Sequence, residues 1–202
     1  MRLIPPPVGP RLIRLLFGLF LFGFGLGLMV VADLGLPAWE VLHQGIARNT
    51  PLRIGQAGIV VGFLVLIVWI PLRERPGPGT VANALLVGLF IDLTIAVMPA
   101  VTAPVWRWTL TFGGIVVVGL GSGFYIGAGL GPGPRDGLMT GIARRGPSLR
   151  LTRTLIEGSA LAGGWLLGGT VGAGTIAFTL MIGPLVQFFL PRLDIGGRLP
   201  GT

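Results

Sequence analysis

The sequence predicts an all-α integral membrane protein: one membrane domain, 1–202, of about six transmembrane helices. Three observations predict this class: 52% of the 202 residues are hydrophobic, only 11% are charged, and the mean hydropathy is +0.85. Ordinary soluble domains carry about 25% charged residues. Because the apolar runs are continuous and do not alternate with polar residues, they favour helices over a β-barrel.

The predicted spans follow from apolar runs long enough to cross about 30 Å of hydrocarbon. The 34 residues between Glu157 and Arg192 are too long for one crossing and must fold back once. The glycines of 168–174 supply the turn. The predicted spans are 11–31, 54–71, 79–98, 105–127, 150–168 and 172–190.

The arginines of the predicted loops are distributed unevenly. With both chain ends on one side, twelve of the 15 basic residues fall there, and the other side has only Arg48, Arg53 and Arg107. The positive-inside rule then places both termini in the cytoplasm. Membrane topology therefore accounts for the net charge of +8, and no nucleic-acid partner is expected.

An internal repeat divides the chain into two halves, about 11–99 and 105–191. Shifted by 96 positions, residues 23–51 match residues 119–147 at twelve of 29 positions. Each half has three predicted spans, an odd number, so the second half enters the membrane from the opposite side. Such inverted repeats are common in secondary transporters, whose sites lie between the repeats near the bilayer midplane.

Two segments interrupt the spans at matched positions. Each has glycine and proline in its first half and predicts a short helix, near 36–48 and near 134–145. Each also carries an acid at the equivalent position, Glu40 in the first and Asp136 in the second.

The interruptions allow two interpretations. As re-entrant segments they dip into the membrane from opposite faces and meet in one cavity, because irregular backbone at membrane depth needs protein or water around it. As surface loops they lie on the interface as amphipathic helices, with Trp39 and Arg144 as anchors.

Three stretches of the sequence resemble a known family. The stretches are "GLGLMVVADLGLPAWEVLHQGIAR", "YIGAGLGPGPRDGLMTGIARR" and "GWLLGGTVGAGTIAFTLMIGPLVQFFLP". Over roughly residues 11–191 the chain is similar to the bacterial YczE/YyaS/YitT family of multi-span membrane proteins, specifically its YczE branch. The resemblance implies a multi-pass protein of the bacterial cytoplasmic (inner) membrane, and it implies no catalytic or substrate residues.

Glu157 is a candidate ion-binding or substrate-binding residue within the fifth predicted span. An ionisable side chain at membrane depth normally faces a bundle interior or an aqueous cavity, and desolvation favours its protonated form. Coupling to a proton is one interpretation. The other is a structural ion pair with Arg153, four positions earlier on the same helical face.

The inner interruption supplies five candidates, of which Arg144 is expected to contact the solute or ion. Asp136 is interpreted as the N-cap of a helix over 137–145. This leaves Arg135 free to face a ligand carboxylate or phosphate, unless it is an ordinary cytoplasmic loop charge. The backbone of Gly131 and Gly133 is expected to contact the ligand.

The outer interruption supplies Glu40 and His43, one helical turn apart. They are predicted to share a proton and to form an outer gate, or else to be an exposed interfacial pair. His43 is the only histidine and the chain has no cysteine, so neither a metal site nor a disulfide is expected.

The third and sixth spans contain further polar positions. Asp92 and its repeat partner Gln187 are predicted to face protein, as a helix–helix hydrogen bond or as a substrate contact. Asn83 either supports the start of its helix or contacts substrate. The motif G-x-G-T, at 77–80 and 172–175, is either an anion-binding helix start or plain turn-and-cap chemistry.

The leading functional hypothesis is a secondary transporter or permease for a small polar or anionic solute, coupled to protons and working by alternating access. It requires a cavity between the halves lined by Glu157 and Arg135. The alternative is a membrane assembly or accessory protein that docks a partner through Arg144 and Arg145. No enzymatic activity and no cofactor are expected; the partners are the lipid bilayer, the solute and protons, and a homodimer is left open.

Overall fold

The computed structural model describes residues 6–195, and within them the chain forms eight helices and no strand. The chain ends that are predicted to be cytoplasmic, with Arg2 and Arg198, lie outside the described residues. The all-α class is confirmed. The helices are α1 (Val8–Ala32), α2 (Ala38–Asn49), α3 (Ile54–Trp69), α4 (Pro78–Val97), α5 (Pro104–Gly127), α6 (Pro134–Ala143), α7 (Leu149–Leu166) and α8 (Ala173–Leu193).

Four helices are long and apolar enough to cross a membrane: α1, α4, α5 and α8. The short helices α2 and α3 qualify together as a fifth candidate, although they are bent by 114° at their junction. The other two predicted spans, 54–71 and 150–168, are also helical. However, α3 alone has only 16 residues, and α7 carries three charged residues, Arg150, Arg153 and Glu157. The chain is a multi-pass membrane protein, and the count of six spans stays a prediction.

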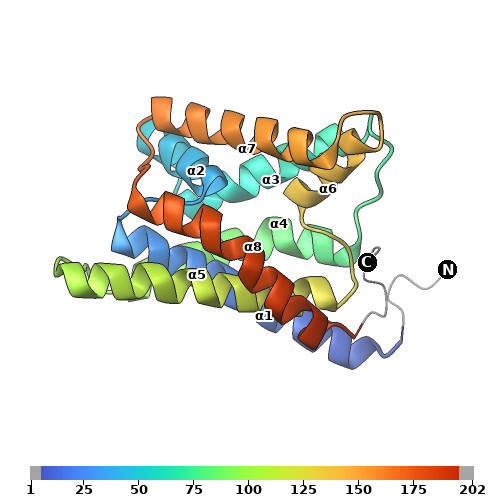
Figure 1. Ribbon diagram of the computed structural model, residues 1–202, viewed down its shortest axis with the longest axis horizontal. Coiled ribbons are helices and arrows are strands. Elements are labelled where there is room, and N and C mark those ends of the chain that lie inside the picture. Colours follow the sequence, from blue (N-terminus) through green and yellow to red (C-terminus); the bar gives the residue numbers. More distant parts are fainter. Residues whose placement is uncertain (1–5, 196–202) are drawn as a thin grey trace.

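The eight helices form two layers (Figure 1). The long helices α1, α4, α5 and α8 pack in one layer, in which α5 contacts both α1 and α8. The other layer contains α2, α3, α6 and α7, and it joins the first where α3 and α6 contact α4. Each layer therefore takes two helices from each half of the sequence.

Glycines set the close approach of α1 and α5, the most extensive helix contact in the first layer. A Cβ on Gly18 would lie 2.9 Å from the carbonyl oxygen of Gly121, and a Cβ on Gly25 would lie 2.6 Å from that of Gly114. These distances leave no room for a side chain at the crossing. The helices approach backbone to backbone, as small residues allow in membrane proteins.

The loops before α2 and α6 each form hydrogen bonds with the other half of the chain. The carbonyl of Leu34 accepts a 2.7 Å hydrogen bond from the amide of Gly174, and that of Leu130 accepts a 2.9 Å bond from Gly79. Each loop contains a glycine with a left-handed backbone, Gly35 at φ 114° or Gly131 at φ 119°. Only glycine adopts such angles readily.

These contacts decide between the two interpretations of the G-x-G-T motif. The hydroxyls of Thr80 and Thr175 each accept a 3.2 Å hydrogen bond from the first glycine amide of their own motif. The second glycine amide bonds to the crossing loop. The turn-and-cap interpretation is confirmed. Because these amides already have partners, the anion-binding interpretation is wrong.

The short helices α2 and α6 are covered by protein of the opposite half. Helix α2 packs on α7, and α6 packs on α3. Trp39 is only 9% exposed, so it is not the surface anchor that the interfacial interpretation required. Arg144 is exposed and pairs with Glu74, with both carboxylate oxygens 3.1 Å from the Nη1 atom.

Candidate functional site

A cavity of about 590 Å³ lies between the two helix layers, and residues from all eight helices line it. Its wall is mostly apolar and contains a few converging polar side chains, which is typical of small-molecule sites. Both Glu157 and Arg135 line it, as the transporter hypothesis requires. The sequence candidates in its lining are Glu40, His43, Asn83, Gly133, Arg135, Asp136, Glu157 and Gln187.

The first turns of α2 and α6 meet at this cavity. The Nη2 atom of Arg135 on α6 donates a 2.9 Å hydrogen bond to the Oε1 atom of Glu40 on α2, and the two form an ion pair. Glu40 is 1% exposed, whereas 28% of the Arg135 side chain remains accessible. The two interruptions of the sequence are therefore in direct contact inside the protein.

Trp39 and His43 add unsatisfied polar atoms to the same wall. The guanidinium of Arg135 lies over the Trp39 ring, 5.0 Å from its centroid. The indole Nε1 of Trp39 and both ring nitrogens of His43 are buried and have no hydrogen-bond partner among the described residues. Buried polar atoms without partners are rare in proteins and call for an explanation, such as a ligand or bound water.

The predicted proton-sharing pair is not hydrogen-bonded. His43 Nδ1 lies 3.8 Å from Glu40 Oε1, which is longer than a hydrogen bond. The Glu40 carboxylate bonds to Arg135 instead. His43 is 1% exposed, so the alternative of an exposed interfacial pair is wrong as well.

Asp136 is not the N-cap that the sequence predicted. Helix α6 begins with Gly133 as its N-cap and Pro134 at the first helical position, so Asp136 lies in the first turn. A proline fits that position because its missing N–H is not needed there. The carboxylate of Asp136 instead accepts a 3.2 Å hydrogen bond from the hydroxyl of Tyr125 on α5.

The environment of Asp136 disfavours its charge. The Asp136 side chain is exposed, but it lines the central cavity, so protein groups lie around it. Desolvation raises the pKa of the Asp136 carboxyl above its ordinary value, and the charge of Glu157 adds to this. Arg153, the Tyr125 hydroxyl and Arg135 act in the opposite direction.

Glu157 forms the ion pair that one interpretation anticipated. The Nε atom of Arg153 donates a 3.0 Å hydrogen bond to the Oε1 atom of Glu157, one helical turn later on α7. Both residues also line the cavity. The structural ion pair is confirmed, whereas the role of Glu157 in ion or proton binding stays a prediction.

Three sequence candidates lie away from the central cavity. Asp92 accepts a 2.7 Å hydrogen bond from the amide of Gly55 at the start of α3, which is the helix–helix bond that one interpretation predicted. Gly131 packs against Thr80, and Arg144 pairs with Glu74 on the surface. None of these three residues lines the central cavity.

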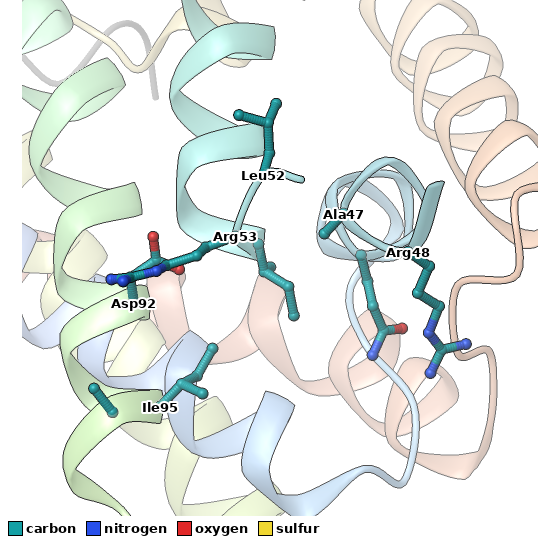
Figure 2. A pocket seen from close by; sticks show the side chains of 9 residues that line it. Ala47, Arg48, Leu52, Arg53, Asp92 and Ile95 are labelled. Atoms are coloured by element: carbon teal, nitrogen blue, oxygen red, sulfur yellow. The ribbon is translucent and has the colours of Figure 1, made fainter. Parts of the chain in front are cut away.

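Asp92 belongs to a second cavity, of about 520 Å³, beside the α2–α3 junction (Figure 2). Figure 2 shows the Arg53 side chain reaching toward Asp92, while Arg48 extends from α2. Arg48 is engaged by the opposite half, since it donates to the carbonyl of Gly168 and, at 3.2 Å, to the hydroxyl of Thr170. This second cavity holds one carboxylate beside two guanidinium groups.

The sequence reasoning missed Tyr125 as a site residue. It is the only tyrosine of the chain and lies at the end of an apolar span, which was the one available signal. Arg153 was considered only as a partner of Glu157. Tyr125 lies at the cavity where it bonds to Asp136, and Arg153 reaches the cavity because α7 packs on α6. The pattern of a single helix encodes neither contact.

The chain is similar to several known proteins. A model of the "Family of unknown function (DUF6198)" matches residues 9–191. An "Uncharacterized protein" of Haemophilus influenzae is 42% identical over 187 residues, covering 92% of this chain and 84% of the relative. No solved structure matches.

Two Bacillus subtilis proteins are also similar. The "Uncharacterized membrane protein YczE" is 33% identical over 87% of this chain and 83% of its own length. The "Uncharacterized protein YyaS" is 24% identical over 88% of this chain and 90% of its own length. These two matches confirm the resemblance that the motifs indicated.

Proposed function

The chain belongs to the DUF6198 family of unknown function, and on that premise we propose that it is a secondary transporter for a small polar solute. The observation that carries the proposal is the ion pair between Arg135 and Glu40, which joins two half-helices at the wall of a central cavity. Helix starts that meet beside a solute-sized cavity are a recurrent feature of transporters.

An inverted repeat is part of the proposal. Helices α5 to α8 begin 96, 96, 95 and 95 residues after α1 to α4, so the halves share their element order and spacing. The contact of Gly18 with Gly121 has a counterpart in that of Gly114 with Gly25, as a shift of 96 positions requires. Both observations support two equivalent four-helix units with opposite orientations in the membrane.

The two halves differ around the cavity, and we propose that this difference reflects one state of an alternating-access cycle. Helix α3 packs along α4, whereas the equivalent helices α7 and α8 make at most marginal contact. Exposed residues of α8, including Thr179 and Gln187, line the cavity on that side. In the alternate state α7 would approach α8, and α3 would separate from α4.

The proposal includes an orientation and a coupling residue. Both termini face the cytoplasm of a bacterial inner membrane, and the α2–α3 junction faces outside, because this arrangement puts twelve arginines inside and three outside. Glu157 couples solute movement to protons. When its carboxylate is protonated, the pair with Arg153 breaks and α7 is free to move.

The accessory-protein alternative receives less support from the contacts of the arginines. It needs Arg144 and Arg145 to be available for a partner, but Arg144 pairs with Glu74 and Arg145 donates to the carbonyls of Gly141 and Leu72. Their side chains link the end of α6 to the loop between α3 and α4, so they are engaged inside the protein and not by a partner.

The test is solute flux in proteoliposomes containing the purified protein, measured over a broad panel of small metabolites with and without a pH gradient. We expect uptake of at least one polar solute, accelerated by the gradient, and loss of that acceleration in Glu157→Gln. The matched control is Glu74→Gln, a carboxylate that also pairs with an arginine but lies outside the cavity. Protein that moves neither solute nor protons would contradict the proposal.

A further inference from the structure

Three oxygen atoms from three helices converge beside Gly133. A Cβ placed on this glycine would lie 3.3 Å from Asp136 Oδ2, 3.4 Å from Tyr125 Oη and 3.6 Å from Asn83 Oδ1. Glycine leaves that space empty, and all four residues line the central cavity. The three oxygens therefore lie close together beside a residue that has no side chain to cover them. A group that binds in the cavity against Gly133 can contact a carboxylate, a hydroxyl and an amide oxygen.

The carboxylate of Asp136 has no cationic side chain in direct contact among the described residues. Among the described residues lining the cavity are three carboxylates and two guanidinium groups. Glu40 and Glu157 each pair with an arginine, whereas Asp136 has no cationic atom within 4.0 Å in the described part of the chain and accepts only the Tyr125 hydroxyl. A positively charged ligand supplies the missing partner.

The geometry favours an ammonium group over a metal ion. Divalent cations need several oxygen ligands at about 2.0–2.6 Å and usually more than one carboxylate, and no cluster of three metal-ligating side chains occurs in residues 6–195. The cluster beside Gly133 instead offers one carboxylate and two neutral oxygens, all of which can accept N–H···O hydrogen bonds. An ammonium also has three donors, one for each oxygen.

The remainder of the cavity suits the carbon skeleton of such a ligand. Phe22, Val118, Phe178 and Ile182 contribute apolar surface to the wall. The buried Trp39 Nε1 and the His43 ring nitrogens, which have no partner in the described chain, are independent evidence that a polar ligand belongs in this space.

We propose that Asp136, Tyr125 and Asn83 form a binding subsite for the ammonium group of a small organic amine. This inference rests on the proposed function in one respect, that the amine is the transported solute. An acid in the first turn of a helix also offsets the helix dipole, but that role does not require the Tyr125 and Asn83 oxygens to lie beside it.

The test measures binding by the purified full-length protein in detergent, by isothermal calorimetry and by the shift in melting temperature. The probes are n-butylammonium, n-butyrate of the same chain length, and sodium ions. We expect saturable binding of butylammonium and none of butyrate. Substitution Asp136→Asn should weaken butylammonium binding about tenfold or more, since it removes the charged acceptor.

Control variants keep the test decisive. Tyr125→Phe and Asn83→Leu each remove one oxygen and should weaken binding by a smaller factor than Asp136→Asn; they also serve if that variant does not fold. Asp33→Asn removes a carboxylate that lies outside the cavity, beside Arg107, and should bind butylammonium like the wild type.

Two outcomes would overturn the subsite. One is that the wild type binds no amine, or binds it equally well after Asp136→Asn; the other is that sodium alone gives the Asp136-dependent shift. Because binding is measured independently of flux, the failure of the subsite can be distinguished from the failure of the transporter proposal. Amine binding without transport contradicts the transporter, and transport of a solute that carries no amine, unaffected by Asp136→Asn, contradicts the subsite.

Discussion

The guanidinium of Arg135 lies 5.0 Å from the ring centroid of Trp39, and these two residues are equivalent under the 96-position shift. Equivalent residues touch each other only near the axis that relates two repeats. Two arginines at such a position would repel each other, whereas an arginine over a tryptophan is attractive. Of the two equivalent residues only Arg135 is a cation, and Glu40 forms an ion pair with it.

The first prediction concerns this ion pair. Substitution Glu40→Gln should lower the free energy of unfolding by about 1.5–3 kcal/mol, the range for hydrogen bonds to charged groups, because Glu40 is buried and Arg135 loses its counter-charge. Unfolding in mixed micelles, followed by circular dichroism, measures the change. The control Glu74→Gln breaks the more exposed pair with Arg144 and should cost about 1 kcal/mol or less. Equal losses in the two variants would contradict the role given to the pair.

The second prediction concerns the contact of α6 with α3. A Cβ on Gly137 would lie 2.0 Å from Cζ2 of Trp69, whose indole donates a 3.0 Å hydrogen bond to the carbonyl of Pro134. Gly137→Ala should therefore destabilise the protein by about 1–3 kcal/mol through overpacking. In Gly158→Ala the new Cβ has no atom within 4 Å, so stability should rise by up to about 1 kcal/mol. An unchanged melting temperature for Gly137→Ala would show that the helices are not in close contact.

The third prediction tests the opposite orientations of the repeats. Because the chain has no cysteine, single-cysteine variants need no prior substitution. Pro51→Cys and Pro147→Cys lie at equivalent positions, and both prolines are exposed. A membrane-impermeant maleimide should label Pro51→Cys in intact cells and Pro147→Cys only after the membrane is permeabilised. Labelling of both variants from the same side would rule out inverted repeats.

The fourth prediction follows from the raised pKa of Asp136, whose largest cause is desolvation. A carboxyl with a raised pKa in the folded state stabilises the protein below its ordinary pKa of about 4, and this contribution is lost as the pH rises through the folded-state value. The wild type should therefore lose more stability than Asp136→Asn as the pH is raised from about 4 to neutral. Groups that also face this carboxyl are Asn83, Tyr125, Arg135, Arg153 and Glu157.

Melting temperatures of wild type and Asp136→Asn over this pH range provide the measurement. The other carboxylates titrate in both proteins, so the difference between the two curves isolates Asp136. Parallel curves would show that its pKa is not raised by folding.

The loop before each short helix illustrates what residue types alone reveal. Gly35 and Gly131 were matched from the sequence, and both have left-handed backbone angles. Two positions earlier Asp33 and Gly129 also share the left-handed region, with φ 49° and 67°. Residue identity does not reveal this equivalence, because an aspartate and a glycine can adopt the same backbone conformation without being similar in chemistry.

The sequence by itself determined the membrane class, the helices and the pairing of segments such as 36–48 with 134–145. Hydrophobic runs, turn glycines and repeat spacing are local properties of the chain, and they place helix boundaries whatever the helices later contact. For this reason the start of every predicted span lies within three residues of the start of an observed helix.

Only the tertiary structure decided which side chains meet. Arg135 reaches Glu40 across 95 positions, and Asp136 bonds to Tyr125 instead of capping its helix. The first contact depends on how α2 packs on α7 and how α6 packs on α3, helices of the opposite half. The packing of α6 on α3 requires a glycine at position 137, because the Trp69 ring lies directly against it. A helical period determines which face of a helix is apolar, but it does not determine the helix that this face will contact.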